Sequence, residues 1–252
     1  MIKLKTQQEI EEMKQAGALS AKVLRMLGEI IKPGISTLEL DQFAERIIRM
    51  HGGVPAFKGY MGFPASICAS VNSQVVHGIP SKDCILQEGD IISIDTGAIV
   101  NGWVGDNAWT YAVGTIDDES KRLLEVTEQC MWAGIQAAQV GNHLGDIGHA
   151  VQSLAQKHGF GVVRELTGHG VGRDMHEDPN VFNFGKPGRG VKLEAGMVIA
   201  IEPMITAGTY RIKTLKDGWT IVTADNKNAA HFEKTIAITN EGPVILTQEF
   251  EL

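Results

Sequence analysis

Four carboxylates stand at the ends of apolar, strand-like runs or close beside them. Two such runs, IISID and VIAIE, end in Asp95 and Glu202, and Glu233 opens a third run. Asp106 follows an Asn101-Gly102 pair, which favours a tight hairpin turn. Because Asp95 precedes this turn and Asp106 follows it, the hairpin can bring the two carboxylates together.

Carboxylates on apolar strands are unfavourable unless an opposite charge compensates them. His169, in the segment TGHGVG, adds a nitrogen ligand to the four acids. Taken singly, an aspartate at a strand end is more often a turn residue, and a GHG segment is more often a tight turn. Together the five side chains carry a charge of about −4 with histidine neutral, which two divalent ions held about 3.5–4 Å apart would balance. The joint pattern therefore favours a two-metal site.

Helices with clear start and stop signals surround these runs. The first starts at Thr6 and stops at Pro33-Gly34, and the second starts at Ser36 and ends at His51-Gly52. Both start with the S/T-x-x-E pattern of a capping box. Further on, we expect strands over 67–76 and 90–100, helices over 117–139 and about 144–158, and strands with glycine loops after residue 159.

An internal repeat at an offset of 107 residues relates the two ends of the chain. The segment GDIISID (89–95) matches GMVIAIE (196–202), which places Asp95 on Glu202, and His51-Gly52 matches His158-Gly159. We therefore expect one α+β domain over 1–252, made of two pseudo-symmetric halves, approximately 1–115 and 116–252. The halves would share one continuous sheet or pack in a tight interface, because no linker separates them.

Composition excludes several classes of protein. The chain has 252 residues, 43% of them hydrophobic, and a net charge of −7, and no block of like charges suggests specific nucleic-acid binding. No apolar run is long enough to span a membrane, and the start lacks the apolar core of a secretory signal. The three cysteines have no CxxC spacing, which favours free thiols in the cytoplasm.

Six segments of the sequence resemble the type I methionine aminopeptidases in their short bacterial form. The resemblance implies the pita-bread fold, with antiparallel sheets covered by helices, and it covers the chain almost from end to end. The segments are FKGYMGFPASICASVNSQVVHGIP (57–80), IISIDTGAIVNGWVGDNAWTYAVG (91–114), TGHGVGRDMHEDP (167–179), GMVIAIEPM (196–204), DGWTIVT (217–223) and AHFEKTIAIT (230–239).

The resemblance also implies a role for each matching residue. Two divalent ions would be held by five ligands, of which Asp106 and Glu233 would bridge the ions. His77 would contact the substrate near its amino terminus, and His176 would hydrogen-bond the scissile carbonyl. The full set is Asp95, Asp106, His169, Glu202 and Glu233 for metal, His77, His176 and Glu202 for catalysis, and Tyr60, Phe63, Cys68, His77, Met175, His176 and Trp219 for the substrate.

Four positions depart from the family's usual pattern. Met175 stands where the family often has Phe, Met61 where many members have His, and Lys234 where His is common, while Asp174 adds a charge beside the pocket. None of these changes removes a ligand or an active-site histidine. We therefore expect activity to be kept and the shape of the methionine pocket to differ.

The implied reaction is metal-assisted amide hydrolysis at the first residue of a nascent chain that begins with Met and a small second residue. His176 would stabilise the oxyanion, and Glu202 would carry a proton to the leaving amine. The metal could be Co, Mn, Fe(II) or Zn, because one nitrogen and many carboxylate oxygens suit all of them.

The expected partners are a peptide or nascent chain and, transiently, the ribosome, with the protein a monomer as is usual in the family. Two alternatives remain: a related metallopeptidase of X-Pro specificity, and a non-catalytic binding protein of the same fold.

Overall fold

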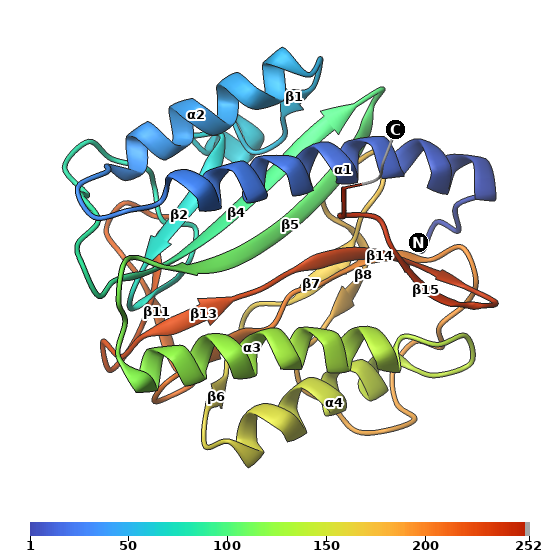
Figure 1. Cartoon of the computed structure of the whole chain (residues 1–252). Coiled ribbons are helices and arrows are strands. Elements are labelled where there is room, and N and C mark those ends of the chain that lie inside the picture. Colours follow the sequence, from blue (N-terminus) through green and yellow to red (C-terminus); the bar gives the residue numbers. More distant parts are fainter. Residues whose placement is uncertain (250–252) are drawn as a thin grey trace.

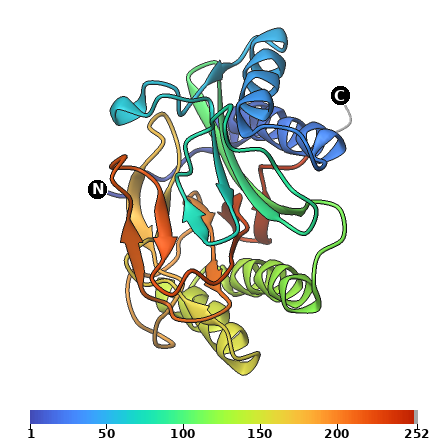
Figure 2. The same cartoon turned by 90° about the vertical axis from the view of Figure 1, so that its left-hand side faces the viewer.

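Helices and sheets alternate in layers in this protein. The structure is a computed structural model that describes residues 1–249. One pair of helices, α1 and α2, lies above one antiparallel sheet, and a second pair, α3 and α4, lies below another, with the two sheets facing each other between them (Figures 1 and 2). The helices are α1 (Gln7–Ile30), α2 (Thr37–Met50), α3 (Asp118–Ala137) and α4 (Leu144–Lys157), with a short 3-10 helix at Tyr60–Gly62.

Local signals in the sequence predicted the helix starts correctly. The Thr6 hydroxyl accepts a hydrogen bond from the Glu9 amide and the Glu9 carboxylate accepts one from the Thr6 amide, so the capping box is complete. Ser36 and Glu39 form the same pair of bonds at the start of α2. These bonds satisfy amides that the first turn of a helix leaves unpaired.

The first sheet is built around a long hairpin. Strand β4 pairs with β5 on one side and with β1 and β2 on the other, all antiparallel. The turn falls at Asn101-Gly102, where both residues have positive φ, as the sequence predicted. The strands are β1 (Val54–Pro55), β2 (Ile67–Val71), β4 (Ile91–Val100) and β5 (Trp103–Ala112).

The second sheet has the strand order β15-β14-β9-β7-β8. Two three-stranded sheets, β13-β10-β6 and β11-β12-β3, lie beside it. Most of these strands are short, with bounds β3 (Gln74–Val76), β6 (Gly161–Val162), β7 (Gly168–Gly170), β8 (Glu177–Val181), β9 (Val198–Ile201), β10 (Met204–Thr206), β11 (Ile212–Thr214), β12 (Ile221–Thr223), β13 (Ala229–His231), β14 (Lys234–Thr239) and β15 (Gly242–Ile245).

Hydrogen bonds tie the two large sheets together at the junction of β13 and β14. The Glu233 amide donates to the Ala108 carbonyl at 2.9 Å, and the Thr235 hydroxyl donates to the Asp106 carbonyl at 2.7 Å. Within residues 1–249 the strands pair into four sheets rather than one continuous sheet, and β3 of the first predicted half pairs with β12 of the second. This junction places the start of β14 over the centre of β5.

Three of the four buried apolar clusters among residues 1–249 fill the layers. One lies between α1, α2 and the first sheet, and another between α3, α4 and the second sheet. The third lies between the two sheets and includes Phe63, Cys68 and Met175. The apolar part of the predicted substrate pocket therefore belongs to the cluster between the sheets.

Helix α1 approaches two other segments more closely than a side chain would allow. A Cβ atom at Gly105 of β5 would overlap the backbone of Ala16 and Gly17, and a Cβ at Gly17 would overlap the carbonyl of Leu246. Glycine at both positions lets α1 lie directly between β5 and the segment after β15.

None of the helices in residues 1–249 combines the length and the apolar character needed to cross a membrane.

Candidate metal centre and substrate pocket

A cavity of about 330 Å³ opens between the two large sheets. Its size lies within the range usual for small-ligand sites. All twelve residues that the sequence singled out line it, so the structure brings the whole predicted set to one place, while the chemical role of each remains a prediction. They are Tyr60, Phe63, Cys68, His77, Asp95, Asp106, His169, Met175, His176, Glu202, Trp219 and Glu233.

The β4–β5 hairpin sets the first two acids. Gly97 pairs with Asp106 and Asp95 pairs with Ala108, so the two aspartates occupy diagonal positions on neighbouring strands. Diagonal side chains of an antiparallel pair share a face and lie within reach of each other. The hairpin thus brings Asp95 and Asp106 to one face, as the sequence led us to expect.

The second sheet supplies the other three candidate ligands from β7, the end of β9 and the start of β14. Ligand atoms of Asp106, His169 and Glu233 all lie within 4.8 Å of one another. The Nε2 atom of His169 is 3.6 Å from Asp106 Oδ2 and 3.5 Å from Glu202 Oε1. On its other side the His169 ring has Nδ1 2.9 Å from the Gly170 carbonyl oxygen. Since a carbonyl can only accept, Nδ1 carries the proton and Nε2 keeps the free lone pair that a metal ligand needs.

Unpartnered buried oxygens test whether these residues fit metal ions. Asp95 Oδ1, Asp106 Oδ1 and Glu233 Oε1 are buried and have no hydrogen-bond partner. Buried polar atoms in folded proteins are nearly always paired, so three orphan carboxylate oxygens in one cavity fit a site that binds cations. The donor set, one imidazole and four carboxylates, suits divalent ions such as Mn, Fe(II), Co or Zn.

Burial shifts the acid–base equilibria of the site strongly. It raises the pKa of Asp106 to about 7. Burial, together with the charges of neighbouring acids, raises the pKa of Asp95, Glu202 and Glu233 well above the usual range. Burial lowers the pKa of His169 to about 4. The protein alone therefore disfavours four ionised carboxylates here, and cations would have to stabilise them.

His176 lies over the metal-ligand cluster. Its ring centroid is 4.2 Å from that of His169, and its Nδ1 is 2.8 Å from the Tyr60 hydroxyl. Burial lowers the pKa of His176, and burial with the charges of Asp174 and Asp106 raises the pKa of Tyr60. A neutral imidazole beside a protonated phenol lets the phenol donate to Nδ1, which leaves Nε2 as the N–H of His176.

His77 is held in an unusual backbone conformation. Its φ is +59°, in the left-handed region that non-glycine residues rarely adopt. The ring faces Trp219 edge-on, with centroids 6.3 Å apart. Strained residues of this kind gather at functional sites, and the strain here aims His77 into the cavity.

The apolar end of the cavity is formed by aromatic and sulfur-containing side chains. Phe63 and Trp219 meet edge to face, with centroids 5.1 Å apart, and Cys68 and Met175 are buried with Phe63 in the cluster between the sheets. Burial raises the pKa of the Cys68 thiol well above its usual value, so this sulfur stays neutral. The cavity therefore has an acidic end and an apolar end that suits a thioether.

Several residues that line the cavity have no role predicted from the sequence. His231 is 1% exposed, its Nε2 has no hydrogen-bond partner, and that atom is 3.4 Å from Glu202 Oε2. Its position two residues before Glu233, on the same strand face, was the only available signal. Phe57 and Met204 also line the cavity, and nothing in their local sequence marked them.

Two of the residues that depart from the family pattern, Lys234 and Met61, lie where they do not affect the shape of the apolar end of the cavity. Lys234 donates to the Thr247 carbonyl at 2.9 Å and lies over the ring of Trp109, so its ammonium group points away from the cavity. Met61 lines the rim of the cavity and is 81% exposed. Neither side chain narrows the apolar end.

Comparisons with known proteins agree with this geometry. The pattern of metallopeptidase family M24 matches residues 11–240. The chain is 54% identical to methionine aminopeptidase 1 of Bacillus subtilis over 248 residues (98% of this chain, 100% of that protein), and 52% identical to methionine aminopeptidase of Clostridium acetobutylicum over 247 residues (98% and 99%). The structure of methionine aminopeptidase from Thermotoga maritima superposes with a TM-score of 0.97 at 45% identity, covering 99% of this chain and 100% of that one.

Proposed function

This chain belongs to metallopeptidase family M24 and has its pita-bread fold, and from that premise we propose that it removes the N-terminal methionine from proteins whose second residue is small. The observation that carries the proposal is the two-ended cavity. Carboxylates and His169 gather at one end, and Phe63, Cys68, Met175 and Trp219 form the other. A methionine side chain in the apolar end would bring its own peptide bond to the acidic end.

Five residues would hold the metal: Asp95, Asp106, His169, Glu202 and Glu233. We propose two divalent ions, because four carboxylates carry a charge that a single ion would leave half compensated. Ions bound there would supply Lewis-acid activation of a water molecule and of the scissile carbonyl. The three orphan carboxylate oxygens support this assignment.

The remaining polar residues of the cavity would bind and move protons. His176, with Nε2 as its N–H, would donate to the carbonyl oxygen as negative charge develops on it. His77 would contact the substrate near its amino terminus and the scissile amide. Glu202 would carry a proton to the leaving amine, and its carboxylate lies between the Nε2 atoms of His169 and His231.

Substrate selection would follow from the apolar end. The edge-to-face pair of Phe63 and Trp219 gives the pocket rigid aromatic walls, and the sulfur atoms of Cys68 and Met175 add polarisable contacts. Tyr60 borders the pocket and also positions His176. An unbranched thioether would fit these contacts better than a β-branched side chain would.

The cellular setting is part of the same proposal. We propose that the protein acts in the cytoplasm as a monomer, on nascent chains and in transient contact with the ribosome. Three free cysteines, of which Cys68 and Cys130 are buried, support a reducing compartment.

One assay tests the activity. Metal-depleted and metal-restored protein is offered Met-Gly-Met and Ala-Pro-Ala, and release of the first residue is measured. We expect hydrolysis of Met-Gly-Met only, and only with metal. Cleavage of Ala-Pro-Ala instead would assign the X-Pro specificity, and no cleavage of either peptide at any metal tested would favour the non-catalytic alternative.

A further inference from the structure

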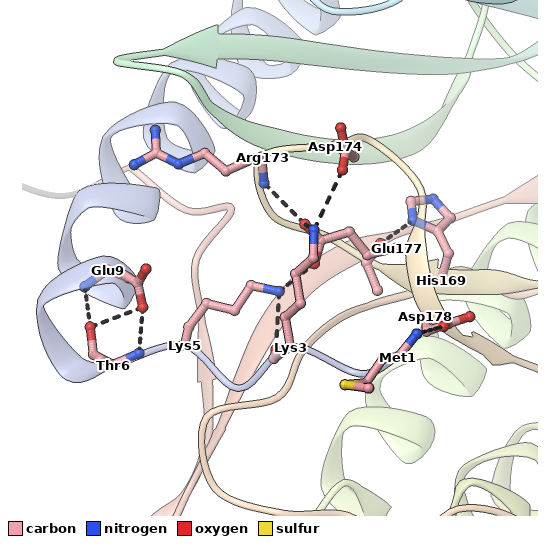
Figure 3. A network of polar contacts seen from close by, with 11 residues as sticks. Met1, Lys3, Lys5, Thr6, Glu9, His169, Arg173, Asp174, Glu177 and Asp178 are labelled. Atoms are coloured by element: carbon pink, nitrogen blue, oxygen red, sulfur yellow. Dashed lines mark hydrogen bonds and ion pairs between the residues drawn. The ribbon is translucent and has the colours of Figure 1, made fainter.

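The first six residues of the chain run across the second sheet and bind the loop that carries His176 (Figure 3). We call residues 1–6 the N-terminal strap and residues 171–176, between β7 and β8, the His176 loop. The Lys5 amide donates to the Gly196 carbonyl at 2.7 Å, which fixes the strap beside the sheet. The α-ammonium group of Met1 pairs with Asp178, just beyond the loop.

Glu177 links the strap to the loop. Its Oε2 accepts a hydrogen bond from Lys5 Nζ at 2.5 Å, and its Oε1 accepts one from the Arg173 amide at 3.2 Å. A Cβ atom at Gly172 would overlap this carboxylate, so Gly172 leaves the room that it occupies. The side chain of Glu177 thus folds back into the loop that precedes it and ties Arg173, inside the loop, to the residue that follows the loop.

The Lys5–Glu177 ion pair is buried, since each side chain is only 5% exposed. Burial alone would raise the pKa of Glu177, but the hydrogen bond and charge of Lys5, helped by Lys3, lower it below its usual value. Lys5 also donates to the Lys3 carbonyl at 3.2 Å. Removing Lys5 would leave the Glu177 carboxylate with only the exposed Lys3 ammonium, 3.5 Å away, as a charge partner, which favours a movement of the loop that brings Glu177 to water.

Two residues of the candidate site depend on where this loop lies. His176 directly precedes Glu177, and Met175 precedes His176, and both side chains line the cavity. Tyr60 contacts His176 from the other side, so the ring is held between the Tyr60 hydroxyl and the backbone that Glu177 anchors. We propose that Lys5 is a positioning residue that acts through Glu177 to hold His176 in place for hydrolysis. This inference rests on the proposed function and deepens it.

A comparison of two lysines on the same carboxylate tests the proposal. Lys5→Met removes the buried donor, whereas Lys3→Met removes a lysine that is 61% exposed, lies 3.5 Å from the same carboxylate and also pairs with the exposed Asp174 of the His176 loop at 3.6 Å. Pairs this exposed contribute little to stability. We expect Lys5→Met to lower kcat on Met-Gly-Met by up to about 100-fold, because small misplacements of catalytic groups are that costly. KM and metal content should change little, and Lys3→Met should keep kcat within about twofold. Equal losses in the two variants would overturn the assignment to Lys5.

A double-mutant cycle separates positioning of His176 from a general structural effect. If Lys5 acts through His176, adding Lys5→Met to His176→Ala should lower kcat hardly further, because the group that Lys5 positions is already gone. Two independent losses that multiply would overturn the proposal. Lys5→Arg keeps a cationic donor, so it should retain most of the kcat that Lys5→Met loses. A kcat as low as that of Lys5→Met would also contradict the role of the Lys5–Glu177 pair.

Hydrogen exchange tests whether Lys5 holds the His176 loop in place, without any assay of activity. In Lys5→Met, amides of residues 172–177 should exchange at least about tenfold faster, while amides of α3 should exchange at an unchanged rate. If Lys5→Met folds poorly, Glu177→Gln is measured in its place, and the same amides should show a smaller increase. Unchanged exchange in the loop would overturn the proposal. If the parent protein fails to cleave Met-Gly-Met, the proposed function fails, and the exchange measurement still shows whether the strap holds the loop.

Discussion

The Tyr60 hydroxyl lies 2.8 Å from Nδ1 of His176, although the two residues are 116 positions apart in the chain. Their rings are tilted by 35°, with centroids 5.4 Å apart. The phenol therefore holds the imidazole in position. With the phenol as donor to Nδ1, the N–H of His176 lies on Nε2, which is the arrangement an oxyanion donor requires.

Substitutions of His176 and Tyr60 should distinguish the effect of losing the oxyanion donor from the effect of losing the residue that positions it. His176→Ala should lower kcat on the order of 100–1000-fold with a much smaller change in KM, because an oxyanion donor acts mainly in the transition state. Tyr60→Phe should lower kcat less and in the same direction, since the imidazole remains but loses its hydrogen bond at Nδ1. Steady-state kinetics on Met-Gly-Met measure both. A rise in KM with kcat intact in His176→Ala would show that His176 binds only the ground state.

Loss of either carboxylate that we propose to bridge the ions should prevent metal binding. Asp106→Asn or Glu233→Gln removes a charge and a ligand oxygen from a buried cluster, so metal content and hydrolysis should both fall below detection or nearly so. Elemental analysis and turnover provide the two readouts, with the exposed Asp118→Asn on α3 as the matched control. Normal metal stoichiometry with near-normal turnover in either variant would exclude the dinuclear assignment.

Metal removal should destabilise the protein. Four buried carboxylates without cations repel one another, and a ligand present at 100 times its dissociation constant stabilises the folded state by about 2.7 kcal/mol. For a chain of this size that amounts to a fall in Tm of about 5–10 °C on chelation. Calorimetry with and without chelator measures it, and restoring metal should reverse the change. An unchanged Tm would indicate that the carboxylates are stabilised in some other way.

Met175 should make the substrate pocket adaptable. It is flexible and buried beside Phe63, so norleucine should be accepted within about 10-fold of methionine, because one sulfur contact is worth roughly 0.3–1.5 kcal/mol. Leucine should be a poorer substrate because of its branch. Met175→Phe should lower turnover of norleucine and leucine relative to methionine. The values of kcat/KM for Met-, Nle- and Leu-Gly-Gly on both proteins test this, and unchanged ratios would remove Met175 from the pocket wall.

Features that depend on neighbouring residues could be predicted from the sequence. The capping boxes at Thr6 and Ser36 set helix starts through bonds that span three residues. The Asn101-Gly102 turn fixes the register of β4 and β5 and thereby the diagonal placement of Asp95 and Asp106. The twelve site residues were found partly in this way and partly through a family resemblance that covers almost the whole chain.

Features that depend on distant partners could not be predicted. His231 is unremarkable in its own segment, and only the fold brings its Nε2 beside Glu202. Lys5 and Glu177 are 172 positions apart, and neither lies in a pattern that signals burial. The short strands after residue 159 carry too few residues for a periodic pattern, so their pairing was also beyond prediction.

The contact of Gly17 with the carbonyl of Leu246 bears on the order in which the protein folds during synthesis. Helix α1 leaves the ribosome well before one of its packing partners, the segment around Leu246, is made. Contacts so distant in sequence form slowly, because a long segment must be ordered to close them. Part of α1 therefore stays uncovered until the segment around Leu246 has been made, and this helix is where a chaperone or an aggregating neighbour would meet the unfinished chain.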